Sequence, residues 1–215
     1  MAIERMYPWC AKYGLKPTFV AQLDASADVV EGFTHLDPDT IHLTASTTYP
    51  KVFEILKGYK NYIWSGTGGA NLDAHEVWLK HGYKKVVIVN TGGSVCLASM
   101  SLAVMMGFRN LHLFGFDFMV SRQEKNYAAD IAGAGVERTY IEVEVGEEGE
   151  KVLTCTSFLA FAQQFFNMLE TQRKWGMVDS VDIYGESLLT KMWEKPQGQW
   201  ENEKAKAMEV NAYVQ

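Results

Sequence analysis

One segment, residues 85–117, constrains the fold of this chain more than any other. Lys85–Asn90 (KVVIVN) is a nearly continuous β-branched run, which is typical of a parallel strand buried on both faces. A glycine-containing turn, Thr91–Ser94, leads into a predicted apolar helix over Val95–Met106, and a second strand is predicted over Leu111–Phe114. Two parallel strands joined through a helix form a βαβ unit with a right-handed crossover. The segment therefore predicts a parallel sheet.

Further elements are expected on both sides of this unit. Upstream, the pattern predicts, in order, a helix at 3–13, strands at 18–23 and 40–44, a helix at 50–56, a strand at 61–65 and a helix at 73–81. Downstream, it predicts a hairpin of 139–145 with 151–155, a helix from a Ser157 cap to about 174, a strand at 181–184 and a helix at 187–193. We expect an α/β fold: a Rossmann-like, mostly parallel sheet with helices on both faces, plus a C-terminal β-hairpin and helices.

Length and composition fit a folded protein. The 215 residues are 47% hydrophobic and 21% charged, which suits a globular domain. We expect one domain over residues 1–193 and a charged tail over 194–215 that is helical or disordered.

The charge balance excludes some partners. Twenty basic residues against 26 acidic ones give a net charge of −6, whereas duplex-DNA-binding proteins usually carry a basic excess. No stretch reaches the roughly 18 apolar residues of a membrane span, and the N-terminus lacks a signal-peptide pattern. Three cysteines without CxxC spacing suggest reduced thiols. We therefore expect a soluble, cytoplasmic protein that does not bind nucleic acid and does not span a membrane.

The turn formed by Thr91, Gly92, Gly93 and Ser94 is the first candidate site. Glycines allow close backbone approach, and a helix N-terminus offers N–H groups and a positive dipole end, so a phosphate could bind there. The alternative is that Ser94 only caps the helix and the glycines only make the turn. The run is neither GxGxxG nor a P-loop.

Polar residues at other strand ends form the second candidate site. Asp24 and Asp117 each follow a predicted strand, as do Ser46 and Thr47, and Gly68 lies beyond a third strand. Ligands of open α/β sheets bind beyond the carboxyl ends of the strands, so these residues should share one rim with the glycine turn. Alternatively, both aspartates only initiate turns.

The histidines carry less information. His42 and His112 lie inside predicted strands, where they are expected to be core or face residues. No Cys/His cluster with zinc-ligand spacing is present in the sequence.

Three stretches resemble a known family. The run TGGSVCLASMSLAVMMGFRNLHLFGFDFM (91–119), with GLKPTFVAQLDAS (14–26) and VDIYGESLLTKM (181–192), resembles the 6-hydroxymethylpterin diphosphokinase MptE-like family. That family includes the central domain of motility accessory factor proteins, and it more distantly resembles bacterial sialyltransferases that use CMP-sialic acid.

The resemblance implies a nucleotide-dependent transferase. Gly92, Gly93 and Ser94 would face the nucleotide phosphates, while Asp24 and Asp117 would be catalytic and would hold Mg²⁺. The leading expectation is diphosphate transfer from ATP to a small acceptor such as a hydroxymethylpterin. The alternatives are sugar transfer from a CMP-activated donor and a non-catalytic, nucleotide-binding or oligomeric subunit.

One departure from the family pattern concerns the N-terminus. Only about a dozen residues precede Gly14, so the strand and glycine loop that normally come first are expected to be missing. A sheet without that strand would need compensation, and Trp9, Trp64 and Trp78 are candidates for an apolar surface. Both points favour a homo-oligomer.

Overall fold

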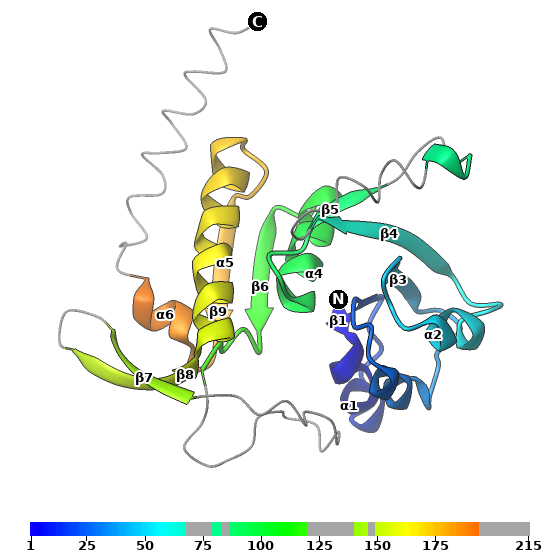
Figure 1. Ribbon diagram of the computed structural model, residues 1–215, viewed down its shortest axis with the longest axis horizontal. Helices are drawn as coiled ribbons and strands as arrows, with labels where there is room; N and C mark the ends of the chain where they lie inside the picture. Colours follow the sequence, from blue (N-terminus) through cyan, green and yellow to red (C-terminus); the bar gives the residue numbers. More distant parts are fainter. Residues whose placement is uncertain (68–78, 83–86, 120–139, 146–148, 194–215) are drawn as a thin grey trace, which may run out of the picture. The chain divides into compact units, whose positions relative to one another are not determined.

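The computed structural model describes residues 1–67, 79–82, 87–119, 140–145 and 149–193 (Figure 1). The chain divides into two compact units, residues 1–103 with 127–137 and residues 104–126 with 138–215. The expected single domain over residues 1–193 stays a prediction. The predicted helix at 73–81, the loop after Asp117 and the tail over 194–215 lie largely or wholly outside the described residues.

The first unit contains a five-stranded sheet in which every recorded pairing is parallel, as predicted. The βαβ prediction that the strand near 111–114 belongs to the same sheet as β5 is not met, because Asn110–Phe114 pairs with Ser180–Tyr184 in a separate sheet. Its spatial order follows the sequence: β1 (Ala2–Ile3), β2 (Phe19–Gln22), β3 (Ile41–Ala45), β4 (Asn61–Thr67) and β5 (Ile88–Asn90). Because all strands run the same way, their carboxyl ends lie along one edge of the sheet, here called the carboxyl edge.

The start of the chain differs from the prediction. The structure has strand β1, a 3-10 turn η1 (Glu4–Met6) and a shorter helix α1 (Tyr7–Lys12) instead of one helix over 3–13. Ile3 is extended and pairs with Ala21, while Pro8 near the start of α1 favours the first helical turn. The expected absence of a strand before Gly14 is therefore wrong, although no glycine loop follows β1.

Helical segments cover both faces of this sheet. On one face, Ala98 and Leu102 of α4 (Val95–Met105) pack against Leu43, Trp64 and Val89. On the other face, His42 contacts Tyr7 of α1 and Phe33 of η2 (Ala27–Phe33). The η2 segment packs in turn on α2 (Pro50–Ile55), through a buried apolar cluster of Val29, Phe33, Val52 and Leu56. Helices on both faces of a parallel sheet are the predicted architecture.

Two burial predictions in the first unit are corrected. Trp64, expected on an apolar surface, is only 3% exposed because it lies under α4. Conversely, β5 is not buried on both faces: Val89 is buried, whereas Ile88 is 40% exposed. β5 is the last strand of the described sheet, so neighbours surround it less completely. Trp9 is half-buried, and Trp78 lies outside the described residues.

The second unit contains the predicted hairpin and the C-terminal elements. Strands β7 (Tyr140–Val145) and β8 (Glu150–Cys155) pair antiparallel, and β6 (Asn110–Phe114) pairs in parallel with β9 (Ser180–Tyr184). Helices α5 (Thr156–Lys174) and α6 (Leu188–Met192) complete the unit. The predicted cap of α5 is wrong, because Cys155 occupies the N-cap position and α5 already includes Ser157.

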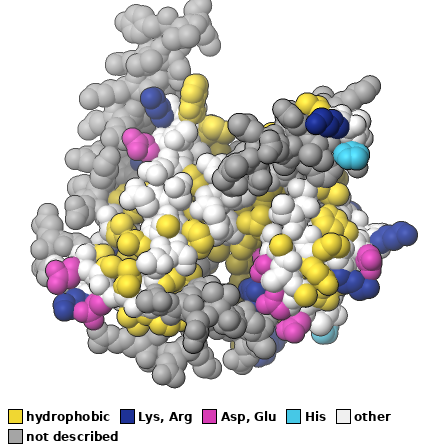
Figure 2. All heavy atoms as spheres, viewed as in Figure 1, with side chains coloured by type: hydrophobic (Ala, Val, Ile, Leu, Met, Phe, Trp, Pro, Cys, Tyr) yellow, Lys and Arg dark blue, Asp and Glu magenta, His cyan; other side chains and the backbone are white. Residues whose placement is uncertain are grey.

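Aromatic side chains form the core of the second unit. Phe116 and Phe118, just after β6, contact Phe165 and Phe161 of α5. Figure 2 shows further hydrophobic side chains at the surface of the molecule, among charged ones. None of the helices in the described ranges combines the length and apolar character that a bilayer crossing requires.

Candidate functional site

The glycine turn after β5 has the backbone that its sequence suggests. Gly92 and Gly93 have φ of 53° and 88°, a left-handed conformation that glycine adopts without strain. Their N–H groups donate to side-chain oxygens of the same segment, Gly92 to Asn90 Oδ1 (3.1 Å) and Gly93 to Thr91 Oγ1 (3.3 Å). Ser94 Oγ accepts from Leu97 N (3.2 Å), so Ser94 does cap α4. Ligand oxygens could take the place of these side-chain acceptors.

Gly66 of β4 and the side chain of Thr91, the first residue of the turn, lie very close together. A Cβ atom on Gly66 of β4 would lie 2.7 Å from Thr91 Cγ2, which is shorter than real contacts allow. Thr91 is buried, and its methyl group fills the space that a side chain at position 66 would need. Gly66 therefore sets where Thr91, and with it the turn, can sit.

The structure places several predicted residues at the carboxyl edge of the first unit. Asp24 follows β2, Ser46 and Thr47 follow β3, and the turn follows β5. Ser46 Oγ lies 3.4 Å from Ser65 Oγ of β4, and Thr47 is exposed. Gly68 lies outside the described residues, and Asp117 belongs to the second unit. Their roles in ligand binding stay predictions.

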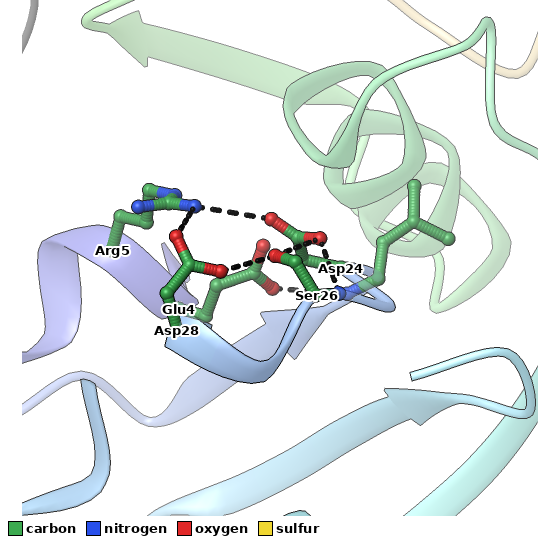
Figure 3. Close-up of polar contacts among 6 residues, drawn as sticks. Glu4, Arg5, Asp24, Ser26 and Asp28 are labelled. Atoms are coloured by element: carbon green, nitrogen blue, oxygen red, sulfur yellow. Dashed lines mark hydrogen bonds and ion pairs between the residues drawn. The ribbon is translucent and has the colours of Figure 1, made fainter. Parts of the chain in front are cut away.

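Asp24 is part of a cluster of charged side chains (Figure 3). Arg5 Nη2 lies 3.2 Å from Asp24 Oδ2 and 3.0 Å from Asp28 Oδ2. The N–H of Ser26 donates to Asp24 Oδ1 (2.9 Å), and its hydroxyl, which has one proton, lies within hydrogen-bond distance of both Asp24 Oδ1 (2.7 Å) and Asp28 Oδ1. Hydrogen bonds from Ser26 and Arg5 hold the pKa of Asp28 below its ordinary value. Both Asp24 oxygens are thus engaged, and Asp24 does initiate a turn.

Sequence reasoning missed Glu4 and Arg5. Glu4 is 3% exposed, and its Oε2 accepts a hydrogen bond from Leu23 N (2.9 Å). Burial, opposed by that hydrogen bond and helped by the charge of Asp24, raises the pKa of Glu4 to about 8. Their position directly after a strand could have identified both residues as candidates. That strand, β1, was predicted as part of a helix, so the position was not recognised.

Asp117 lies in the second unit, between two buried phenylalanines. It is exposed, whereas its neighbours Phe116 and Phe118 are buried. No hydrogen bond or ion pair from a described residue reaches its carboxylate, and partial desolvation raises its pKa above the ordinary value. An exposed carboxylate of this kind can accept a proton or contact a ligand.

The two strand histidines are core and face residues, as predicted. His42 is buried, its Nδ1 accepts from Gln22 Nε2 (2.9 Å), and burial lowers its pKa to about 4. His112 is exposed beside Asp182 (3.3 Å) and the Tyr184 hydroxyl (3.0 Å).

The donor set suits a metal ion only if a ligand accompanies it. Within the described part of the chain, no group of three or more His, Cys, Asp or Glu side chains could hold a metal ion. Mg²⁺ commonly uses one or two carboxylates together with substrate phosphates, so single carboxylates at the site are compatible with it. Both Asp24 oxygens are paired and Asp117 belongs to the other unit, so a role of either residue in holding Mg²⁺ stays a prediction.

Comparisons with known proteins support the fold through one solved structure and the family through one family model. The chain is similar to the solved structure of the MAf glycosyltransferase from Magnetospirillum magneticum AMB-1, with a TM-score of 0.57 and 15% identity, over 97% of this chain and 32% of that chain. That likeness supports the α/β fold, and the chain spans about a third of its neighbour's length. No curated protein matches the sequence. The model of one family, described as 6-hydroxymethylpterin diphosphokinase MptE-like, matches residues 1–123. The match covers more than half of the chain, which therefore belongs to the MptE-like family.

Proposed function

We propose that this protein is a nucleotide-dependent transferase that moves a diphosphate group from ATP to a small acceptor such as a hydroxymethylpterin. Family membership supports a transferase-type function. The observation that carries the proposal is the pair of left-handed glycines, Gly92 and Gly93, between the carboxyl end of a parallel strand and an 11-residue helix. Backbone N–H groups and a helix dipole at such a position favour phosphate.

The carboxyl edge of the first unit would bind the nucleotide mainly through uncharged groups. N–H groups of Gly92 and Gly93 would exchange Asn90 and Thr91 oxygens for phosphate oxygens, and the hydroxyl of Ser94 would add a donor. Ser46 and Thr47 would line the same edge, and Gly68, which lies outside the described residues, is included on the sequence alone. This arrangement suits an acidic protein, because the anion would be held by oriented dipoles rather than by many lysines and arginines.

In the proposed reaction the acceptor hydroxyl attacks the β-phosphorus of ATP. The bond from that phosphorus to the oxygen bridging the α-phosphate breaks, AMP leaves with this oxygen, and the acceptor carries the diphosphate. Asp117, exposed and without a described partner, would accept the hydroxyl proton. Mg²⁺ bound with the nucleotide would neutralise phosphate charge, and Asp117 or Asp24 would hold it.

A second candidate is glycosyl transfer from a CMP-activated sugar. The fold likeness to a protein described as a glycosyltransferase favours it, and Asp24 and Asp117 would then orient the cytidine and its ribose. A third candidate is a nucleotide-binding subunit without catalysis that acts as a homo-oligomer.

Calorimetry with Mg·ATP, Mg·CTP and CMP tests these candidates on the wild type and on Gly93→Ala. We expect Mg·ATP to bind the wild type and to bind Gly93→Ala about tenfold or more weakly, since a Cβ strains the turn. Gly58→Ala is the matched control: Gly58 has φ of 96° with open space around its Cβ position, so it should lose similar stability and keep its affinity.

The outcome distinguishes the candidates. AMP release from ATP with hydroxymethylpterin supports the leading proposal, and a preference for CTP or CMP supports the glycosyl alternative. Binding without turnover, with a dimer or larger species by light scattering, supports the subunit. Equal affinity of Gly93→Ala and the wild type would refute the phosphate turn.

A further inference from the structure

The backbone around Asp117 is strained. Phe118 has φ of 46°, and it is the one non-glycine residue with a positive φ among those that the structure describes. An aromatic residue rarely adopts this conformation, which persists only where surrounding contacts hold it. The residue next to the candidate carboxylate is therefore held in place by its neighbours.

Three successive carbonyl groups in this segment are each held by a hydrogen bond. Ser187 Oγ donates to Phe116 O (2.6 Å), Leu188 N donates to Asp117 O (2.7 Å), and Thr154 Oγ1 donates to Phe118 O (2.8 Å). The donors come from β8 and from the start of α6, two elements far apart in sequence. Thr154 and Ser187 have no exposed surface, so water does not compete for these bonds.

The rings on either side of Asp117 are anchored as well. Phe116 lies 6.5 Å from Phe165 and Phe118 lies 6.2 Å from Phe161, both measured between ring centroids. With both neighbours packed on α5 and all three carbonyls held, the backbone of Asp117 is fixed, and so is the direction in which its side chain leaves that backbone. Such support is expected around a residue that must meet a ligand in one geometry.

We propose that Thr154 and Ser187 are positioning residues that hold the Asp117 carboxylate in place through the backbone of residues 116–118. The inference rests on the proposed function, since it supposes that Asp117 meets the nucleotide or its acceptor. A positioning role differs from a purely structural one. Removal of either hydroxyl should weaken nucleotide binding by more than the loss of folding stability accounts for.

The test uses the isosteric change Thr154→Val in the full chain, with Thr154→Ser as the conservative variant. We expect Thr154→Val to weaken Mg·ATP binding by about tenfold or more, since small misplacements of a functional group are costly. It should also shift the backbone amide resonances of Asp117 and Phe118. Thr154→Ser keeps the donor and should retain both the wild-type affinity and the wild-type resonances.

Thr40→Val is the matched control for loss of a buried threonine hydroxyl. Thr40 is 2% exposed and donates to Pro17 O (2.9 Å) in the first unit. It should lower the melting temperature about as much as Thr154→Val while leaving the Mg·ATP affinity unchanged. Ser187→Ala is a second variant for the case that Thr154→Val does not fold, and it should reproduce the weaker binding.

The result separates this inference from the proposed function. Wild-type protein that binds neither Mg·ATP nor Mg·CTP overturns the proposed function, and the amide resonances then decide the positioning role alone. Unchanged Asp117 and Phe118 resonances in folded Thr154→Val protein overturn the inference. Wild-type affinity in both Thr154→Val and Ser187→Ala also overturns it.

Discussion

The buried carboxyl group of Glu4 accepts a 2.9 Å hydrogen bond from the backbone N–H of Leu23. The bond joins the segments that follow β1 and β2 at the carboxyl edge of the sheet. A Cβ on Gly32 of η2 would lie 3.0 Å from the Glu4 carbonyl oxygen, so the η2 segment packs closely over it. Glu4 therefore lies against the segment after β2 and against η2, and burial raises the pKa of its carboxyl group to about 8.

This buried acid should make the protein less stable as the pH rises. Between the ordinary glutamate pKa of 4.5 and the folded-state pKa of about 8, the folded state binds a proton that the unfolded state has released. The contribution of Glu4 to the free energy of unfolding should then fall by up to about 1.4 kcal/mol per pH unit across this range. Glu4→Gln keeps the shape without the titration, so urea unfolding from pH 6.5 to 8, above the range in which His42 titrates, should show a flatter profile. An equally steep profile in the variant would contradict this.

His42 should act in the opposite direction at lower pH. Its pKa falls from 6.5 to about 4 on folding, so below pH 6.5 the unfolded state binds the proton first and stability declines. In the wild type this loss offsets the gain from Glu4 between about pH 4.5 and 6.5. In Glu4→Gln protein it should appear alone, as an acid-side decline.

A double variant checks the assignment of that decline. His42→Asn retains an acceptor for the Gln22 amide and lacks the titrating ring. Because the smaller side chain leaves a cavity in the core, the variant should be less stable than the wild type at pH 7 by about 1–3 kcal/mol. When combined with Glu4→Gln, it should show no decline between pH 6.5 and 4.5. A persistent decline would assign it to other groups.

Most strands could be predicted because their signal is local. The β-rich runs predicted at 18–23, 40–44 and 61–65 match β2, β3 and β4 within two residues. β1 could not be recognised, because two residues carry no periodicity and Ile3 is extended only through its pairing with β2. Exposure was also beyond a local pattern: Trp64 is buried by α4, which lies about thirty residues further along the chain.

The part of the candidate site that glycines mark in the local sequence could be predicted. The part that depends on contacts between residues far apart in sequence could not. Gly92 and Gly93 signalled a left-handed turn, and the structure has one. The pairing of Arg5 with Asp24 and Asp28 crosses from one strand end to the next, so nothing near Asp24 in sequence indicates it. The same holds for Thr154 and Phe118, which are 36 positions apart.

Arg5 should stabilise the protein by offsetting the repulsion between two carboxylates. Arg5→Met leaves Asp24 and Asp28 close together without a cation, which should cost about 1 kcal/mol at pH 7. Asp28→Asn should restore part of that loss in the Arg5→Met background. Lys51→Met removes an exposed pair with Glu54 and should cost less than Arg5→Met. Equal losses in chemical denaturation would argue against a special role for Arg5.

The close approach of Gly66 to Thr91 should make position 66 intolerant of any side chain, because Thr91 belongs to the glycine turn of residues 91–94. Gly66→Ala places a Cβ 2.7 Å from Thr91 Cγ2, and neither backbone can move without disturbing β4 or β5, so it should cost about 1–3 kcal/mol. Thr91→Ser removes the methyl group and keeps the hydroxyl that accepts from Gly93 N. The double variant should recover most of the stability, which a double-mutant cycle measures as coupling. Additive losses would mean that the strain of Gly66→Ala lies elsewhere than at Thr91.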